Sequence, residues 1–257
     1  MLKIEKTEVV GWEAAIRGMR NPLNSWEKSD SNYRPILCKR CDNCMSYQLE
    51  QWDDCEQCEV EQQTNAHNGF MIGPNDHGLM EKLRNAGTDH RKFMRMIEVY
   101  ADITAPLYWW KEYDTYKVGT VANSCSTMHT IAAKEFTLED FSHEHLIDDA
   151  YSAFSLYDNA GKYTGLDMSP KDILQLVCNV MNYYRKKYLE TKDKQDWWQM
   201  IQLLPSSYNQ KRTVMLSYEV LANIYKSRRH HKLDEWHTLC DWIEDLPHSE
   251  MITGCEK

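Results

Sequence analysis

The sequence predicts an α/β (α+β) protein that folds as one domain over residues 1–257. Alternating side chains at residues 2–10 and 93–103 predict strands. Apolar side chains at helical spacing after Pro170 predict a long core helix. With 42% hydrophobic residues, 9 tryptophans and 15 tyrosines, a chain of 257 residues can bury a sizeable core.

Charge and composition exclude several classes of protein. The net charge of −9 argues against a protein that coats nucleic acid through a general positive field. No apolar run approaches the ~20 residues that span a bilayer, so we expect no membrane association. The first residues, MLKIEKTEVV, lack the apolar core of a signal peptide, and we expect a cytoplasmic protein. An odd number of cysteines, 9, then predicts reduced thiols or metal ligands rather than a disulfide framework.

The first third of the chain predicts a strand, a helix and an insertion. The strand at residues 2–10 leads into a helix at residues 12–19, which the Asn-Pro pair at residues 21–22 ends. Residues 25–69 are polar and have no sustained period. We interpret them as an insertion within the domain.

Five cysteines lie in this insertion with the spacing C-x2-C-x2-C-x10-C-x2-C. Paired C-x2-C motifs place four thiolates around a zinc ion, and the predicted ligands are Cys38, Cys41, Cys55 and Cys58. Cys44 is left over or exchanges with one of them. Coordination by four thiolates leaves no open position for water, so such a zinc is structural. An iron–sulfur cluster and a cysteine-rich loop without metal are the alternatives.

The middle of the chain predicts a helix and then a strand. Asn75 or Asp76 is the expected N-cap of a helix that runs to residue 85, and Gly87 ends it. A turn or short helix separates it from the strand at residues 93–103.

Residues 105–129, the central stretch, predict a buried helix followed by a binding surface. Ala-Pro opens the helix, and its aromatic side chains leave no wide polar face; they are Tyr108, Trp109, Trp110 and Tyr113. From Asp114 onward the residues are mostly hydroxyl, amide and charged types. Such side chains suit a polar ligand better than a core, so we expect this segment to line a binding site.

The last part of the chain predicts more helices. Thr137 is an expected N-cap, residues 158–165 an expected turn, and Ser169-Pro170 the start of the core helix. Its expected core positions are Ile173, Leu176, Val177, Val180, Met181 and Tyr184, with Cys178 as a packed thiol. A shorter helix at residues 196–204 contributes Trp197 and Trp198, which we also expect in the core.

The central stretch resembles the flavin-dependent thymidylate synthases. Their signature is a buried helix that begins Ala-Pro, followed by R-H-R-x-x-S-x-N-E-x-S-x-R-Y. Thr115, Tyr116 and Lys117 stand where R-H-R would fall, and Thr120 stands at the first Ser. With a slip of one residue, Asn123 matches the Asn and Ser126 the second Ser. The order of the motif is kept, but most of its charge is lost.

Residues 203–236 resemble the C-terminal segment of the same family. The matching residues are Leu204, Pro205, Asn223, Arg228, His230 or His231, Glu235 and Trp236. His90 is a weaker match to a position that faces the flavin. The matches cover roughly the last two-thirds of the chain in the right order, which chance explains poorly.

The resemblance implies a mixed or antiparallel central sheet with long helices, and FAD as cofactor. It implies dUMP as the pyrimidine deoxynucleotide, with 5,10-methylenetetrahydrofolate and NADPH as co-substrates. It also implies a homotetramer whose sites combine residues of several subunits. The implied nucleotide contacts are Glu112, Lys117, Asn123, Ser124, Cys125, Ser126 and Arg228. The implied flavin contacts are His90, Thr115, Tyr116, Lys117, Val118, Asn223 and His230.

Several positions depart from the family pattern. Thr115 lacks the forked donors of arginine, Lys117 offers a point charge, and Met128 replaces the later arginine. Ser217 and Glu219 stand where flavin-contacting Asn and Arg occur in the family. Cys125 has no assignable basic partner, and the family does not attack uracil with a cysteine, so no catalytic residue is assigned.

Three functions are therefore open. The first is a divergent flavin-dependent thymidylate synthase. The second is a relative that binds nucleotides or modifies pyrimidines by another reaction. The third is an interaction protein that uses the cysteine-rich insertion. Flavin absorbance, nucleotide binding without flavin, or neither would distinguish them.

Overall fold

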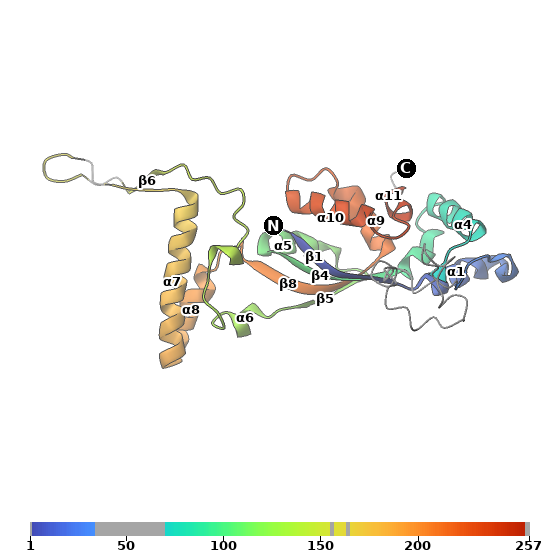
Figure 1. Cartoon of the computed structure of the whole chain (residues 1–257), viewed down its shortest axis with the longest axis horizontal. Coiled ribbons are helices and arrows are strands. Elements are labelled where there is room, and N and C mark those ends of the chain that lie inside the picture. The colour runs from blue at the N-terminus through green and yellow to red at the C-terminus, as the bar shows by residue number, and fades with distance from the viewer. Residues whose placement is uncertain (1, 34–69, 155–156, 163–164, 255–257) are drawn as a thin grey trace, which may run out of the picture. The chain divides into compact units, whose positions relative to one another are not determined.

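The computed structural model describes residues 2–33, 70–154, 157–162 and 165–254 (Figure 1). The chain divides into two compact units. Unit 1 comprises residues 1–3, 103–115 and 123–212, and unit 2 comprises residues 4–102, 116–122 and 213–257. The cysteines predicted to bind metal, Cys38, Cys41, Cys55 and Cys58, lie outside the described residues.

A four-stranded sheet in the order β1-β4-β8-β5 is the backbone framework of the fold. Its strands are β1 (Lys3–Val10), β4 (Glu98–Pro106), β8 (Asn209–Ser217) and β5 (Thr120–Ser124). In β4, alternate side chains from Val99 to Ala105 are buried, as a strand with one face on the core requires. The predicted α/β class is confirmed by this sheet and its helices.

Unit 2 holds the helices of the N- and C-terminal parts. These are α1 (Trp12–Arg20), α4 (Pro74–Asn85), α9 (Tyr218–Arg228), α10 (Asp234–Glu244) and α11 (Glu250–Thr253). Short 3-10 helices η1 (Asn21–Leu23), η2 (Trp26–Lys28) and η5 (Arg91–Arg95) and an antiparallel pair, β2 (Asn32–Tyr33) and β3 (Phe70–Met71), complete it. The rings of Trp12 and Tyr218 meet edge to face in its core, with centroids 5.2 Å apart.

Unit 1 holds the aromatic helix and a helical hairpin. Its elements are α5 (Leu107–Tyr113), α6 (Thr127–Thr130), η7 (Leu138–Asp140), the antiparallel pair β6 (Tyr151–Phe154) and β7 (Leu166–Met168), α7 (Pro170–Thr191) and α8 (Lys194–Leu203). The short turn η6 (Asp114–Tyr116) follows α5. Trp109, Trp110 and Tyr113 are buried, which confirms the prediction for the aromatic helix.

The predicted N-cap of α4 is wrong. Gly73, and neither Asn75 nor Asp76, is the N-cap. The free N–H groups of Asn75 and Asp76 donate instead to the carboxylate of Asp30. Asp76 is fully buried and accepts hydrogen bonds from Arg20, Ser29 and Ser31. The cap therefore comes from a residue distant in sequence, which a local pattern does not reveal.

Three other expectations also change. The strand begins at Glu98 rather than Phe93, because residues 93–95 belong to η5. On α7 the buried face is Leu174, Cys178 and Met181, whereas Leu176, an expected core residue, is 48% exposed. Trp198 is 41% exposed rather than in the core. A capping box from Ser169 fixes the start of α7 as predicted.

None of the helices in the described part of the chain combines the length and apolar character that crossing a bilayer requires.

Candidate functional site

Arg228 and Tyr116, assigned from separate sequence blocks, meet in unit 2. The guanidinium carbon of Arg228, at the end of α9, lies 4.7 Å from the ring centroid of Trp236 and 5.6 Å from that of Tyr116. Its Nε donates to the Tyr116 hydroxyl at 2.9 Å. The central stretch and the C-terminal block therefore contribute to one cluster, the Arg228 cluster, formed by Arg228, Tyr116 and Trp236.

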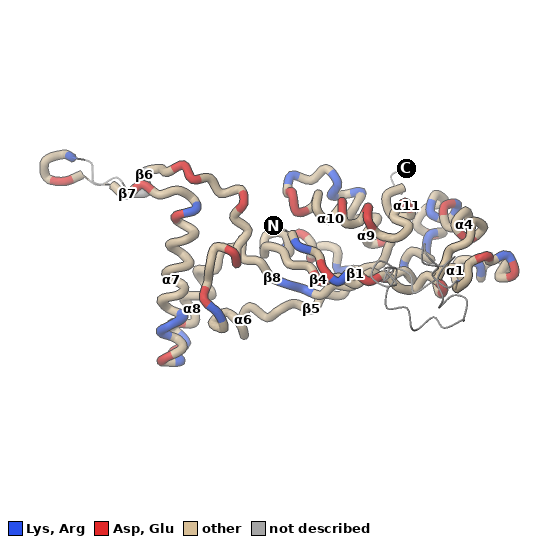
Figure 2. The backbone as a smooth tube through the Cα atoms, viewed as in Figure 1, with Lys and Arg blue, Asp and Glu red and all other residues tan. Residues whose placement is uncertain are grey.

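The connection between α9 and α10 holds this cluster in place. Trp236 is fully buried in α10, and the His231 amide donates to the Arg228 carbonyl at 2.9 Å. The ring centroids of His231 and Trp236 are 6.2 Å apart. Basic residues gather at this connection (Figure 2), and the assigned His230 is exposed there. Aromatic faces attract a guanidinium without neutralising its charge, with about 0.5–2 kcal/mol per contact.

A tight turn after Tyr116 presents two assigned residues to solvent. Lys117 is exposed and Val118 is 92% exposed. The Thr120 hydroxyl donates to the Tyr116 carbonyl at 2.9 Å and closes the turn. Gly119 has a φ of +80°, which other residues adopt at a cost, and a Cβ there would lie 3.2 Å from Val220. The backbone thus fixes the direction of Lys117.

The assigned nucleotide contacts of unit 1 form an exposed polar segment, residues 123–126. All four of its side chains are exposed. The segment is tied to β8, because the Cys125 amide donates to the Lys211 carbonyl at 2.9 Å and Gln210 donates to the Cys125 carbonyl at 3.0 Å. Ser126 accepts from the His129 amide as the N-cap of α6. Asn123 and Ser124 therefore present their polar groups at the surface.

Two further assigned residues lie at the end of α5. The Thr115 hydroxyl donates to the Glu112 carbonyl at 2.7 Å. Trp110 donates to the Gln210 carbonyl at 2.9 Å, which fastens α5 to β8. Thr115 thus completes a helix end and supplies no charge.

Arg212 is a site residue that the sequence did not indicate. Its guanidinium carbon lies 4.2 Å from the Trp110 ring centroid, and its Nη1 lies 2.8 Å from a carboxylate oxygen of Asp114. Its Nε donates to the Gln210 side chain at 3.0 Å. This cation therefore lies beside the segment in which the motif has lost arginine. In the sequence, Arg212 is visible only as half of a Lys-Arg pair, and its partner Asp114 is 98 residues away.

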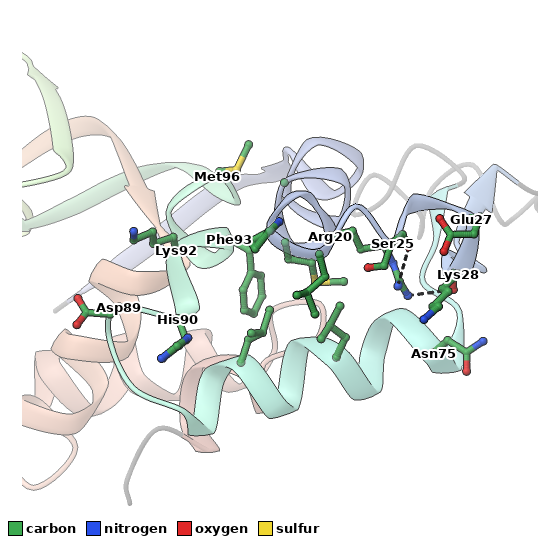
Figure 3. Close-up of a pocket in the computed structure, with 16 residues that line it drawn as sticks. Arg20, Ser25, Glu27, Lys28, Asn75, Asp89, His90, Lys92, Phe93 and Met96 are labelled. Atoms are coloured by element: carbon green, nitrogen blue, oxygen red, sulfur yellow. Dashed lines mark hydrogen bonds between the residues drawn. The ribbon is translucent and has the colours of Figure 1, made fainter.

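His90, also assigned to the flavin, lines a pocket in unit 2 with a volume of about 890 Å³ (Figure 3). Its lining includes the apolar side chains of Leu79, Leu83 and Phe93. His90 and Lys92 lie at one end, and Arg20 and Lys28 at the other (Figure 3). Ligand sites in proteins commonly have volumes of about 300–1,000 Å³ and this mixture of apolar walls and few polar groups.

Glu219, assigned by the resemblance to a flavin-contacting position, belongs to a nearly buried ion pair. The Nε of Arg91 lies 2.9 Å from Glu219, and their side chains are only 12% and 9% exposed. Ser217 caps α9 by accepting from the Val220 amide. Asn223, which this chain shares with the family pattern, is exposed on α9. Glu219 therefore balances Arg91 within the chain.

The cysteines of the described part differ in environment. Burial raises the pKa of the Cys240 thiol to about 11, and burial also raises the pKa of Cys178. These two thiols remain protonated at neutral pH and are poor nucleophiles. Cys125 is exposed.

No family model matches the chain, and no curated protein sequence matches it. Solved structures do. The flavin-dependent thymidylate synthase ThyX from Helicobacter pylori, complexed with FAD and dUMP, aligns over 98% of this chain and 100% of its own, with 14% identity and a TM-score of 0.59. The chain has the fold of the flavin-dependent thymidylate synthases.

A second solved structure supports the same fold. The UMP/dUMP methylase PolB from Streptomyces cacaoi, bound with 5-Br dUMP, aligns over 99% of this chain and 94% of its own. Its identity is 11% and its TM-score 0.50. The resemblance noted in the sequence is thus confirmed at the level of the fold.

On the flavin-dependent thymidylate synthase fold, the assigned residues fall into three groups. The Arg228 cluster and the turn carrying Lys117 form the first, in unit 2. His90 belongs to the pocket of the same unit, and residues 123–126 belong to unit 1. The groups of unit 2 offer cations, which suit phosphate, and the group of unit 1 offers hydroxyls and an amide, which suit a pyrimidine base.

Proposed function

We propose that the protein binds dUMP and FAD and methylates dUMP to dTMP. In this proposal 5,10-methylenetetrahydrofolate donates the carbon and NADPH supplies the reducing equivalents. The observation that carries the proposal is the Arg228 cluster, because it joins two family sequence blocks through two contacts between Arg228 and Tyr116, at 2.9 Å and 5.6 Å. The fold supports it, since one structural neighbour was solved with FAD and dUMP.

For the nucleotide, we assign the phosphate to Arg228 and Lys117. Arginine binds phosphate through two parallel donors, and lysine adds a point charge. The Asn123 amide and the Ser124 hydroxyl are exposed and suit the carbonyl and N–H groups of uracil. Glu112, Cys125 and Ser126 complete the assigned set. We further propose a cytoplasmic homotetramer in which these groups come from more than one subunit, as the family resemblance implies.

For the flavin, the donor set fits the cofactor in part. FAD would supply the hydride transfer. His90, His230 and Lys117 offer positive or hydrogen-bonding groups for a diphosphate, Tyr116 offers a ring, and Asn223 offers an exposed amide. Thr115 and Val118 lie beside them in the sequence. The exception is Glu219, whose carboxylate is already balanced by Arg91 at 2.9 Å. The chain's residues bind and orient; none is assigned a proton transfer.

A second candidate is a relative that binds pyrimidine nucleotides and performs a different reaction on them. The Arg91–Glu219 pair favours it, because a carboxylate stands where the family has a flavin-contacting arginine. One structural neighbour is a UMP/dUMP methylase, so a ribonucleotide is a reasonable second substrate to test.

Product analysis tests the proposal. The full chain is incubated with FAD, methylenetetrahydrofolate, NADPH and either dUMP or UMP, and nucleotides are separated and weighed by mass spectrometry. The proposal predicts a product heavier than dUMP by one methylene group, which disappears when FAD is omitted and when Arg228 is changed to Ala. Binding of dUMP without any methylated product would contradict the first candidate and favour the second.

A further inference from the structure

Three metal-ligating side chains converge where α4 and α11 meet in unit 2. The His77 Nε2 lies 2.8 Å from Oε1 of Glu250, and the His248 Nδ1 lies 3.3 Å from the same oxygen. The ligand atoms of all three residues lie within 4.8 Å of one another. Neither the sequence motifs nor the proposed reaction uses these residues.

The surrounding structure holds these three side chains in position. Arg84 of α4 donates from Nη1 to the Glu250 carbonyl at 2.6 Å. His248 has a φ of +51°, an uncommon conformation for a residue other than glycine, and its ring meets the Trp12 ring at 5.2 Å. Such backbone conformations persist where the surroundings determine them, and they are frequent at functional sites. The turn before α11 therefore directs the His248 ring toward Glu250.

The donor set and the spacing fit one class of ion. Zinc binds imidazole nitrogen and carboxylate oxygen at about 2.0–2.2 Å, and a tetrahedral ion at that distance separates its ligand atoms by about 3.4 Å. The observed separations of 2.8 and 3.3 Å need only small side-chain rotations to reach it. We propose that His77, His248 and Glu250 bind a zinc ion that fastens α11 to α4.

The ionisation of His248 and Glu250 agrees with this assignment. Burial lowers the pKa of His248, which keeps its imidazole neutral at neutral pH. Burial raises the pKa of Glu250, but hydrogen bonds from His77 and His248 outweigh it and the net shift is downward. A metal requires a neutral imidazole and an ionised carboxylate. Arg84 is the neighbouring cation, and its bonded Nη1 meets the Glu250 carbonyl rather than the carboxylate.

The partial exposure of the three side chains determines how an ion reaches the site. The side chains of His77, His248 and Glu250 are 32%, 27% and 47% exposed, so an ion reaches them from solvent. Three protein ligands leave a fourth position for water. Because His77 lies on α4 whereas His248 and Glu250 lie in the turn and first residue of α11, the ion binds only the folded chain and stabilises it.

Zinc binding by the full chain, after treatment with a chelator, tests the proposal. His77→Ala is the main variant, since alanine suits an α-helix, and His237→Ala is the matched control in the same unit. The wild type and the control are expected to bind one more zinc per chain than His77→Ala. In His77→Ala, the zinc affinity of this site should fall about 100-fold, because loss of a residue that only supports a ligand already lowers metal affinity about 10–100-fold.

Two measurements separate this site from the cysteines of the insertion and from a purely structural role. Cobalt difference spectra between wild type and His77→Ala should show ligand-field bands without thiolate-to-cobalt charge transfer. Glu250→Gln keeps the size of the side chain and a hydrogen-bonding oxygen, yet it should lose the zinc-dependent rise in Tm. The proposal would be overturned if wild type, His77→Ala and Glu250→Gln showed equal zinc content and an equal zinc-dependent shift in Tm. The three side chains would then form only hydrogen bonds between histidine and carboxylate.

Discussion

The Arg228 cluster and residues 123–126 both contain residues assigned from the family resemblance, yet their side chains differ in how they are held. Trp236 is fully buried beneath Arg228, and Tyr116 bonds to it directly. The side chains of residues 123–126 are all exposed, and only their backbone and the Ser126 cap are fixed. The first region is held by packed side chains, whereas the second presents exposed polar side chains at the surface.

This difference separates two kinds of mutational effect. Substitutions in the buried region should change the free energy of unfolding as well as binding. Substitutions at residues 123–125 should change binding alone, because an exposed side chain that caps no helix contributes little to folding. Measuring unfolding and nucleotide affinity on the same variants tests the comparison.

The largest expected effect is at the nearly buried ion pair of Arg91 and Glu219. Glu219→Ala leaves Arg91 in a nearly buried position without its carboxylate, and we expect a loss of about 3 kcal/mol in the free energy of unfolding. Urea denaturation measures it. Glu219→Gln, which keeps a hydrogen-bonding oxygen, serves as the milder control. A loss below about 1 kcal/mol would show that this pair is not part of the framework.

Arg228→Ala should reduce dUMP affinity next most strongly. Losing a charged hydrogen bond to phosphate costs about 2 kcal/mol, or about 30-fold in Kd, by isothermal titration calorimetry. The adjacent Arg229 pairs with Glu244, so Arg229→Ala is the matched control and should bind dUMP as the wild type does. Equal affinities for the two variants would remove Arg228 from the nucleotide site.

Asn123→Ala should have a smaller effect that is confined to binding. One neutral hydrogen bond contributes about 1 kcal/mol, so dUMP affinity should fall about 5-fold while Tm stays constant. Asn179, exposed on α7, provides a control substitution to Ala. A drop in Tm for Asn123→Ala would mean that this segment belongs to the framework and that the two regions do not differ.

The smallest expected effect is the loss of folding stability at low pH, measured in the absence of metal. Burial lowers the pKa of His248 in the folded state, so the unfolded chain takes up the proton first as the pH falls. The resulting stability is present above about pH 6.5 and declines toward pH 5. In His248→Asn, which tolerates the positive φ, this decline should be shallower. If the stability of the variant declines equally steeply with pH, another group causes the acid sensitivity. Asp76 is one such group, because its hydrogen bonds lower its pKa despite its burial.

The features that the sequence predicted correctly are local or periodic. The aromatic helix α5 follows from four rings within six residues, and the start of α7 follows from Ser169-Pro170. The features that it missed depend on partners distant in sequence. Asp76 receives Arg20 from 56 residues away, and Arg212 meets Asp114 across 98 residues. His77 and Glu250 are separated by 173 residues, so no spacing rule reveals them.

The exposure of Leu176 and Trp198 has a similar cause. Apolar spacing on α7 allows more than one core-facing stripe, and packing against α8 selects Leu174, Cys178 and Met181. The retained motif residues indicated the fold correctly because they include packed residues such as Trp236. Positions that are charged in the family pattern, such as those of Thr115 and Glu219, hold other residues in this chain without disturbing that packing.

The central claim is that this fold still binds a flavin together with a pyrimidine nucleotide. A visible absorption spectrum of the purified full chain, recorded before and after addition of FAD and then dUMP, tests it most directly. The account predicts bound flavin bands that shift when dUMP is added, with the shift reduced in Arg228→Ala. A protein that stays colourless after FAD and gel filtration, and that shows no change with dUMP, would contradict it.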